Sequence, residues 1–329
     1  MPDRRVLFWT FVAGLLPAAA AWAQSEIGHY APGVVNAKDF VVPDPGWYYC
    51  QYDTYYHSSR FNDEHGNKTD SVTVGSVTLP VTTKLDYLAV SPTLVWTSPW
   101  EVLGGAYGAF VCVPFQTNSL AAEVRGRRFG LNMEESAAGV GDIQVQPVWL
   151  GWRGSSYEIS AAYGFFAPTG RYALGSTDNV GAGFWSNYLQ GSLALYLSES
   201  HGTGFFFTAT YEINSSNSGE HVTGGDHLCL EYSLSQTLGE RVEVALCGSN
   251  VWQTTRDHGS DVTWDTSILD EVHAVGGQLA FWLIPEQAQI SLNGMWEYEA
   301  KDRTHGYYAM LNLMIAVGGA AAPHAHRSP

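Results

Sequence analysis

The chain has 329 residues, with 16 Lys and Arg against 32 Asp and Glu, so its formal net charge is −16. An acidic excess of this size argues against nucleic acid as a partner, because phosphate backbones are bound by clustered cations. Aromatic residues make up 13% of the chain and the mean hydropathy is −0.09, which suits a protein with a lipid-facing band and a polar interior.

The first 23 residues have the features of a secretory signal. Two arginines supply the positive end, residues 6–20 the apolar stretch and residues 21–23 (Ala-Trp-Ala) the small-residue cleavage site. An uncleaved membrane anchor is the alternative, but the apolar stretch is too short for a spanning helix and contains Pro17. We expect export and cleavage before Gln24.

Residues 24–45 are rich in proline, glycine and small apolar residues, and their pattern is too irregular for a strand. We predict that residues 27–42 enter a barrel formed by the rest of the chain and partly close its periplasmic mouth as a plug. A loose periplasmic arm is the alternative.

Twelve segments of alternating apolar and polar residues follow, which is the period of a strand with a different solvent on each face. Each has 11 to 14 residues, enough to cross a bilayer when tilted. The predicted strands are 46–57, 84–96, 104–115, 139–151, 157–167, 185–197, 203–214, 225–236, 241–253, 270–283, 287–299 and 306–317.

The connections between these strands alternate in length. Those after odd strands are long and polar, such as 58–70, 177–183 and 254–264, whereas those after even strands are tight. Outer-membrane barrels have long outer loops, short periplasmic turns and an even number of strands. The sequence therefore predicts an all-β fold, a transmembrane antiparallel up-and-down β-barrel of about 12 strands over residues 46–317, in the bacterial outer membrane. We expect residues 318–329 to be a disordered tail.

A soluble sandwich or lipocalin-like barrel is the alternative fold. It is disfavoured because the apolar faces carry almost no charge in most strands and because aromatic residues gather near strand ends, as interfacial girdles require. The aromatic residues assigned to the girdles are Tyr48, Trp96, Trp100, Trp149, Trp152, Trp185, Trp252, Trp264 and Trp282.

If the apolar faces meet lipid, the other faces line a lumen. Carboxylates and amides there are expected to hold water: Asp142, Gln144, Glu158, Glu212, Glu231 and Glu243. Softer side chains are expected to form a path for a hydrophobic solute: Tyr188, Tyr196, Phe206, Met295, Tyr308, Met310 and Met314. For any single residue, filling of the lumen for stability is the alternative role.

Pairing two strands about the turn at 237–239 sets Cys229 opposite Cys247, and the export route is oxidising, so a disulfide and two free thiols both remain open. Cys50 and Cys112 are assigned opposite facings and are expected to stay free. Arg125, Arg127 and Arg128 cluster in a predicted long loop, where they either pair with lipopolysaccharide phosphates or form a solvated basic turn.

Five blocks in sequence order carry a resemblance to a known family. They are GVGDIQVQPVWLGW (139–152), FFAPTGRY (165–172), NVGAGFWSNYLQGSLALYL (179–197), YEINSSNSGEHVTGGDHLCLEYSLSQTL (211–238) and VWQTTRD (251–257). Together they resemble the outer-membrane family associated with the meta-pathway of phenol degradation. The resemblance implies an outer-membrane barrel related to channels for fatty acids and aromatic hydrocarbons. The chain departs from most such barrels in lacking an aromatic residue at its end.

We therefore expect a channel for passive uptake of small hydrophobic or aromatic compounds. Its partners are outer-membrane lipid, lipopolysaccharide, the solute and the outer-membrane insertion machinery. A structural or surface-interaction barrel without transport is the alternative. An outer-membrane lipid hydrolase, suggested by His57-x-Ser59, is the least favoured reading because no third partner is evident. Nucleotide-binding loops and zinc-ligand spacings are missing from the sequence, so we expect no enzyme, no cofactor and no metal.

Overall fold

The computed structural model describes residues 28–34, 36–74, 77–125, 130–174, 176 and 179–318. The predicted signal sequence, the C-terminal tail after residue 318 and the arginines at 127 and 128 lie outside these ranges. No helix of the described chain is long and apolar enough to cross a membrane.

Fifteen strands form the sheet. They are β1 (Gly46–Asn62), β2 (Ser71–Val74), β3 (Val77–Val102), β4 (Gly105–Cys112), β5 (Phe115–Arg125), β6 (Gly130–Val140), β7 (Ile143–Arg153), β8 (Tyr157–Ala167), β9 (Ser186–Tyr196), β10 (Thr203–Asn214), β11 (His227–Leu238), β12 (Val242–Gln253), β13 (Glu271–Ile284), β14 (Ala288–Lys301) and β15 (Arg303–Gly318).

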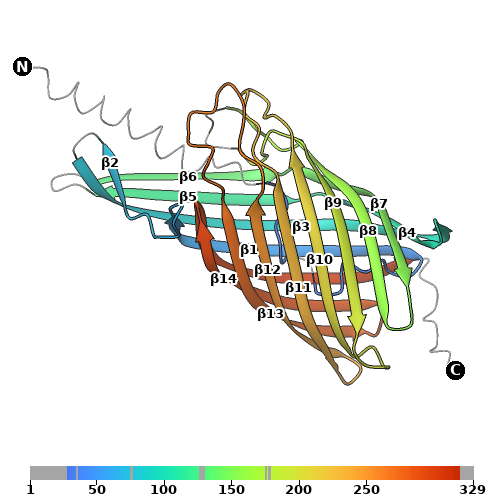
Figure 1. The fold of residues 1–329 in the computed structure, drawn as a ribbon. Helices are drawn as coiled ribbons and strands as arrows, with labels where there is room; N and C mark the ends of the chain where they lie inside the picture. The colour runs from blue at the N-terminus through green and yellow to red at the C-terminus, as the bar shows by residue number, and fades with distance from the viewer. Residues whose placement is uncertain are drawn as a thin grey trace, which may run out of the picture.

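The sheet closes into a barrel because β1 pairs antiparallel with both β15 and β3. Two strands of the wall are interrupted: β4 continues into β5 beyond Pro114, and β6 continues into β7 beyond Asp142. Within the described residues, β2 pairs with β3 alone and stands outside the wall. Counted this way, the wall is a closed antiparallel barrel of 12 strands, which confirms the predicted fold (Figure 1).

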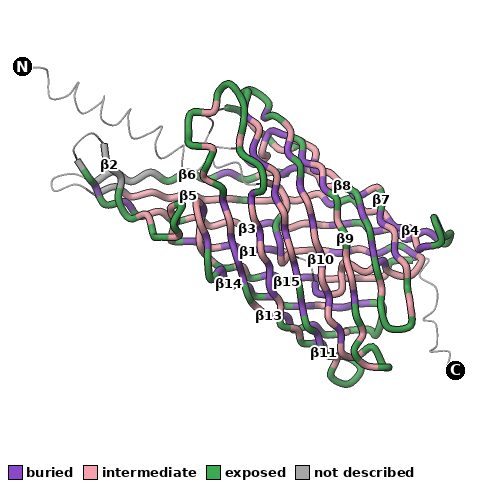
Figure 2. The backbone as a smooth tube through the Cα atoms, in the orientation of Figure 1, coloured by how far each residue is buried: buried purple, intermediate pink, exposed green. Residues whose placement is uncertain are grey.

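Burial alternates along the strands, as expected for a wall with two different faces (Figure 2). In β10 the residues at 204, 206, 208 and 210 are buried, while their neighbours are partly exposed. The opposite face presents large apolar side chains, among them Leu189, Leu246 and Leu292, each more than half exposed. Such a band is what lipid requires of a barrel exterior.

The outer face of β1 departs from this pattern. Gln51 and Asp53 lie on it, Asp53 opposite Leu311 of β15. Tyr49 donates its hydroxyl to Gln51 at 2.7 Å, and the Gln51 amide donates to Asp53 at 3.0 Å. The polar groups therefore pair with one another along the strand, which lowers the cost of placing them on an apolar face.

Strands β5 and β6 were not predicted. With β2 and the first half of β3, they form an arm of the sheet that projects past the end of the barrel wall (Figure 1). The segment 116–138 falls between two predicted strands, in a predicted long loop, because it does not carry the lipid-facing alternation over a full strand length. Arg125 is consequently the last residue of β5 and not part of a loop.

The wall has a seam beside this arm. In the described chain β6 pairs only with β5, and β8 pairs with β7 and β9. The connection between β8 and β9 lies across the seam: the Gln116 amide donates to the carbonyl of Val180, and Val180 is 5% exposed. The connection thus packs against β5 and β6, where β6 extends beyond the end of β8 and has no second strand neighbour in the described chain. This unpaired edge of β6 is the seam.

The cysteine prediction was wrong in register. Cys229 lies opposite Val251, and Cys247 lies opposite Ser233. Strand β11 runs on to Leu238, which pairs with Val242, so the turn is centred two residues later than the sequence suggested. All four cysteines are free thiols.

Candidate functional site

Residues 28–45, here called the N-terminal segment, run inside the barrel. The segment starts beside the long connections, where His29 contacts Ser186 at the start of β9, Phe166 at the end of β8 and Glu212 near the end of β10. It ends near the opposite mouth, where Arg153 pairs with Asp44 at 2.6 Å. The structure therefore places it along most of the lumen, deeper than the mouth-closing plug that the sequence suggested.

Buried carboxylates hold the segment in place. Glu212 accepts the backbone N–H of His29 at 2.7 Å, and Glu231 accepts the N–H of Gly33 at 2.6 Å and the hydroxyl of Tyr30 at 2.6 Å. Hydrogen bonds from charged acceptors of this kind are among the stronger ones in proteins. The polar inward pattern suggested that these carboxylates hold water. Instead, both are bound to the N-terminal segment.

Further along, the segment bonds to the other side of the lumen. Lys38 pairs with Glu243 at 2.6 Å, and the N–H of Ala37 donates to Gln278 at 2.9 Å. The Asp39 carboxylate accepts the hydroxyl of Tyr52 at 3.1 Å. Burial raises the pKa of the Asp39 carboxyl to about 6.

A cavity of about 750 Å³ remains beside the segment. This lies within the range of about 300–1,000 Å³ found for ligand pockets. Much of its wall is aromatic, from β1, β3, β4, β7, β8 and β9: Tyr48, Tyr52, Tyr87, Phe110, Trp149, Phe166, Tyr188 and Tyr196. It extends from Arg153 and Glu158 at the mouth with short turns to Gln116 and Val180 at the seam.

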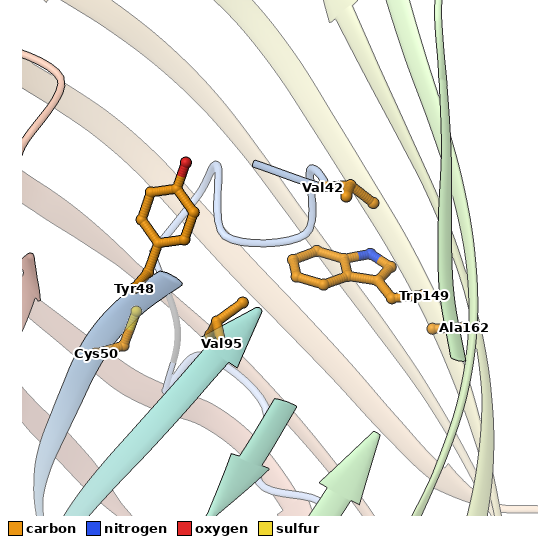
Figure 3. Packing of buried hydrophobic residues seen from close by; sticks show 6 residues of the cluster. All are labelled: Val42, Tyr48, Cys50, Val95, Trp149 and Ala162. Atoms are coloured by element: carbon orange, nitrogen blue, oxygen red, sulfur yellow. The ribbon is translucent and has the colours of Figure 1, made fainter. Parts of the chain in front are cut away.

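Tyr48 and Trp149 belong to this wall, although both were assigned to interfacial girdles. They are 7% and 6% exposed, and they share a cluster with Val42, Cys50 and Val95 (Figure 3). A register shift in β7 between residues 145 and 148 reverses the side-chain alternation, which turns Trp149 inward. The assignment of Cys50 and Cys112 to opposite faces was also wrong, because both line the cavity.

The seven residues predicted to form a solute path separate into three groups. Three line the cavity: Tyr188, Tyr196 and Met314. Three pack together on the other side of the lumen, where the cluster of Met295 and Met310 contacts Val34 of the N-terminal segment and includes Tyr308. Phe206 is 4% exposed and lies in a small crevice with residues 40–42.

The six polar residues divide into two groups, those that bind the N-terminal segment and those that bind side chains of the wall. Asp142, Glu212, Glu231 and Glu243 bind the N-terminal segment. Gln144 donates to the Tyr188 hydroxyl at 3.0 Å, and Glu158 accepts the Tyr196 hydroxyl at 2.6 Å and pairs with Arg153. The period-two pattern could locate these side chains but not their partners.

His29, Tyr52 and Phe166 are lumen residues that sequence reasoning did not single out. Tyr52 and Phe166 sit at inward positions of β1 and β8 and could have been found by the same alternation. His29 lies in an irregular segment, so no periodic signal marked it.

The His57-x-Ser59 pair does not form a catalytic arrangement in the described structure. His57 Nδ1 contacts Asp86 Oδ1 at 2.8 Å, and Lys84 and Tyr55 bind the same carboxylate. Ser59 is exposed and makes no hydrogen bond to His57 within the described chain. These side chains form a polar cluster on the outer face, next to Tyr307.

The family model described as "Putative MetA-pathway of phenol degradation" matches residues 58–313. The chain belongs to this family. The match spans most of the barrel, from the end of β1 to β15. No curated protein sequence matches the chain.

Among solved structures, the COG4313 outer membrane channel from Pseudomonas putida F1 superposes with a TM-score of 0.68 at 15% identity, covering 87% of this chain and 99% of that one. The transport unit of the autotransporter AIDA-I from Escherichia coli gives a TM-score of 0.46 at 10% identity, covering 88% and 98%. A Pseudomonas aeruginosa FadL homologue gives 0.35 at 9% identity, covering 83% and 90%. The first likeness shows the fold, and with the family it places the protein in the outer membrane.

Proposed function

We propose that the protein is an outer-membrane channel for passive uptake of small hydrophobic or aromatic compounds. The observation that carries this proposal is the aromatic wall of the cavity beside the N-terminal segment. Aromatic faces stack on aromatic solutes at centroid separations of about 4.5–7 Å, and a tyrosine also offers a hydroxyl to a polar substituent.

The form of the cavity supports transport better than simple lumen filling. Its lining reaches from residues beside the short turns to residues of the seam, which is most of the depth of the wall. The family description refers to phenol degradation, and the Pseudomonas putida protein of similar fold is an outer membrane channel. The family description agrees with a small aromatic solute as cargo, and the fold agrees with a channel.

Substitution of Tyr188 tests whether the aromatic wall contributes to transport. Tyr188 is 1% exposed, its ring lies 5.7 Å from that of Phe166, and its hydroxyl donates to Gln146 at 2.9 Å. Tyr188→Ala should lower the flux of a phenolic solute into proteoliposomes about three- to tenfold relative to a small sugar, since ring stacking is worth about 0.5–1.5 kcal/mol.

Two matched variants control this experiment. Tyr188→Phe keeps the ring and should keep most of the phenolic flux. Phe206→Ala removes a ring of similar size outside the cavity and should leave the ratio of phenolic to sugar flux unchanged. Equal loss of both solutes in Tyr188→Ala, or no flux in the parent protein, would favour a structural barrel without transport.

A further inference from the structure

Three segments that are distant in sequence meet at one carboxylate. Asp142 lies at the interruption between β6 and β7, and its side chain is 4% exposed. Its Oδ2 atom contacts His29 Nε2 at 2.9 Å and accepts the N–H of Ala182 at 2.7 Å, while Oδ1 accepts the N–H of Gly170 at 2.8 Å. One side chain thus binds both the N-terminal segment and two points of the β8–β9 connection.

Contacts on both sides hold the His29 ring. Asn214 gives its amide N–H to the carbonyl of Gly225, so its oxygen accepts the Ser186 hydroxyl at 2.7 Å. His29 Nδ1 lies 2.7 Å from Ser186 Oγ, and His29 Nε2 lies 2.9 Å from the Asp142 carboxylate. The ring also stacks on Phe166, so three contacts fix its position.

The β8–β9 connection approaches Asp142 closely at two glycines. A side chain at Gly181 would lie 2.8 Å from Asp142 Oδ1 and from the backbone of Gly170, so the two glycines pack face to face. From there the connection crosses the seam, where Val180 lies against β6 beside Gly139. Val180 and Ala182, with His29 and Asp142, line the part of the cavity next to the seam.

We propose that Asp142 is a positioning residue that couples the N-terminal segment to the seam loop, defined as the described residues 168–174 and 179–185 of the β8–β9 connection. Because one carboxylate binds both, each set of hydrogen bonds holds the carboxylate in the position that the other set needs, so release of one side weakens the hold on the other. The segment and the loop then leave the seam end of the cavity together rather than independently. This inference rests on the proposed channel function, since it assigns the residue that controls access to the cavity.

The test measures coupling directly and does not require flux. In a background with the four native cysteines replaced, Gly139→Cys and Val180→Cys allow a disulfide that pins the seam loop to β6. Hydrogen exchange of backbone amides in residues 28–34 is then compared, by mass spectrometry, between the oxidised and reduced forms. The pinned loop should slow this exchange by about tenfold, within the usual range of coupling between sites.

The same comparison with Asp142→Asn should show no effect of the disulfide. Glu231→Gln is the matched control, because Glu231 is a buried carboxylate that binds only the N-terminal segment. It should speed exchange in both forms and leave their ratio unchanged. If Asp142→Asn prevents folding, His29→Ala provides a second test, because it removes the contact between the N-terminal segment and Asp142. The disulfide should then no longer slow exchange in residues 28–34.

A disulfide that slows exchange equally with and without Asp142, or in neither protein, overturns the proposal. Since exchange is independent of solute, failure of the coupling is distinguishable from failure of the channel function. A protein with normal coupling and no phenolic flux would refute the transport function alone.

Discussion

Glu212, Glu231 and Asp142 each accept backbone N–H groups from chain that has no secondary structure of its own. Irregular chain inside a barrel has no strand neighbour to satisfy those donors, and an unpaired buried N–H costs free energy comparable to a lost hydrogen bond. Acidic side chains on the inward face meet that need. This explains their position better than a water-filled pore does, because each is almost fully buried.

Asp39 provides a prediction at the same scale. Its pKa in the folded protein is raised from 3.8 to about 6, so the folded state holds a proton that the unfolded state has already released. The stabilising contribution of this group is therefore complete when the pH is below 3.8, the pKa of the group in the unfolded state. It is lost as the pH rises through about 6, the pKa in the folded state. Asp39→Asn should make the protein more resistant to heat than the parent at about pH 8, and the difference should shrink towards pH ~4. A heat-modifiability gel across that range measures it, and a difference independent of pH would contradict the assignment.

The wall strands of the second half could be predicted closely, because each carries an unbroken alternation between two solvents. The structure has β12 at Val242–Gln253 where the sequence indicated 241–253. The arm formed by β5 and β6 was missed, since strands that do not face lipid carry no such signal. The N-terminal segment's partners could not be predicted either: periodicity shows that Glu231 points inward, but only the path of an irregular chain brings Gly33 to it.

The facing of β12 can be tested directly. Leu246 is 64% exposed on the outer face, opposite Leu234 of β11. Leu246→Arg should sharply lower the yield of folded barrel in the membrane, because arginine at the bilayer midplane costs about 2–4 kcal/mol in such barrels. Leu246→Met keeps an apolar side chain of similar volume and should fold normally. Equal yields of the two variants would show that this face does not meet lipid.

The molecule has two parts, the barrel wall and the N-terminal segment inside it, and different hydrogen bonds hold each part in place. The wall strands pair with one another along their length, whereas in the described chain the hydrogen bonds between the N-terminal segment and the wall run to side chains of the wall. Deletion of residues 27–42 should therefore leave the heat-modifiable barrel intact while raising the passive leak of small sugars. Liposome swelling measures the leak, with Asp39→Asn as a variant that keeps the segment in place. Unchanged swelling after the deletion would mean that other chain fills the lumen.

The N-terminal segment contacts residues that are distant in sequence, and this affects the order in which the parts of the barrel form. Asn36 bonds to Asn312 across 276 residues and Ala37 bonds to Gln278 across 241, whereas neighbouring wall strands pair through short connections. Closing long loops costs more chain entropy, so contacts between distant residues form late. The hairpins of the wall should therefore form first, and the segment should find its partners when β1 meets β15. Seating of the N-terminal segment is then the last step of biogenesis, and a nascent barrel passes through an open form before its lumen is filled.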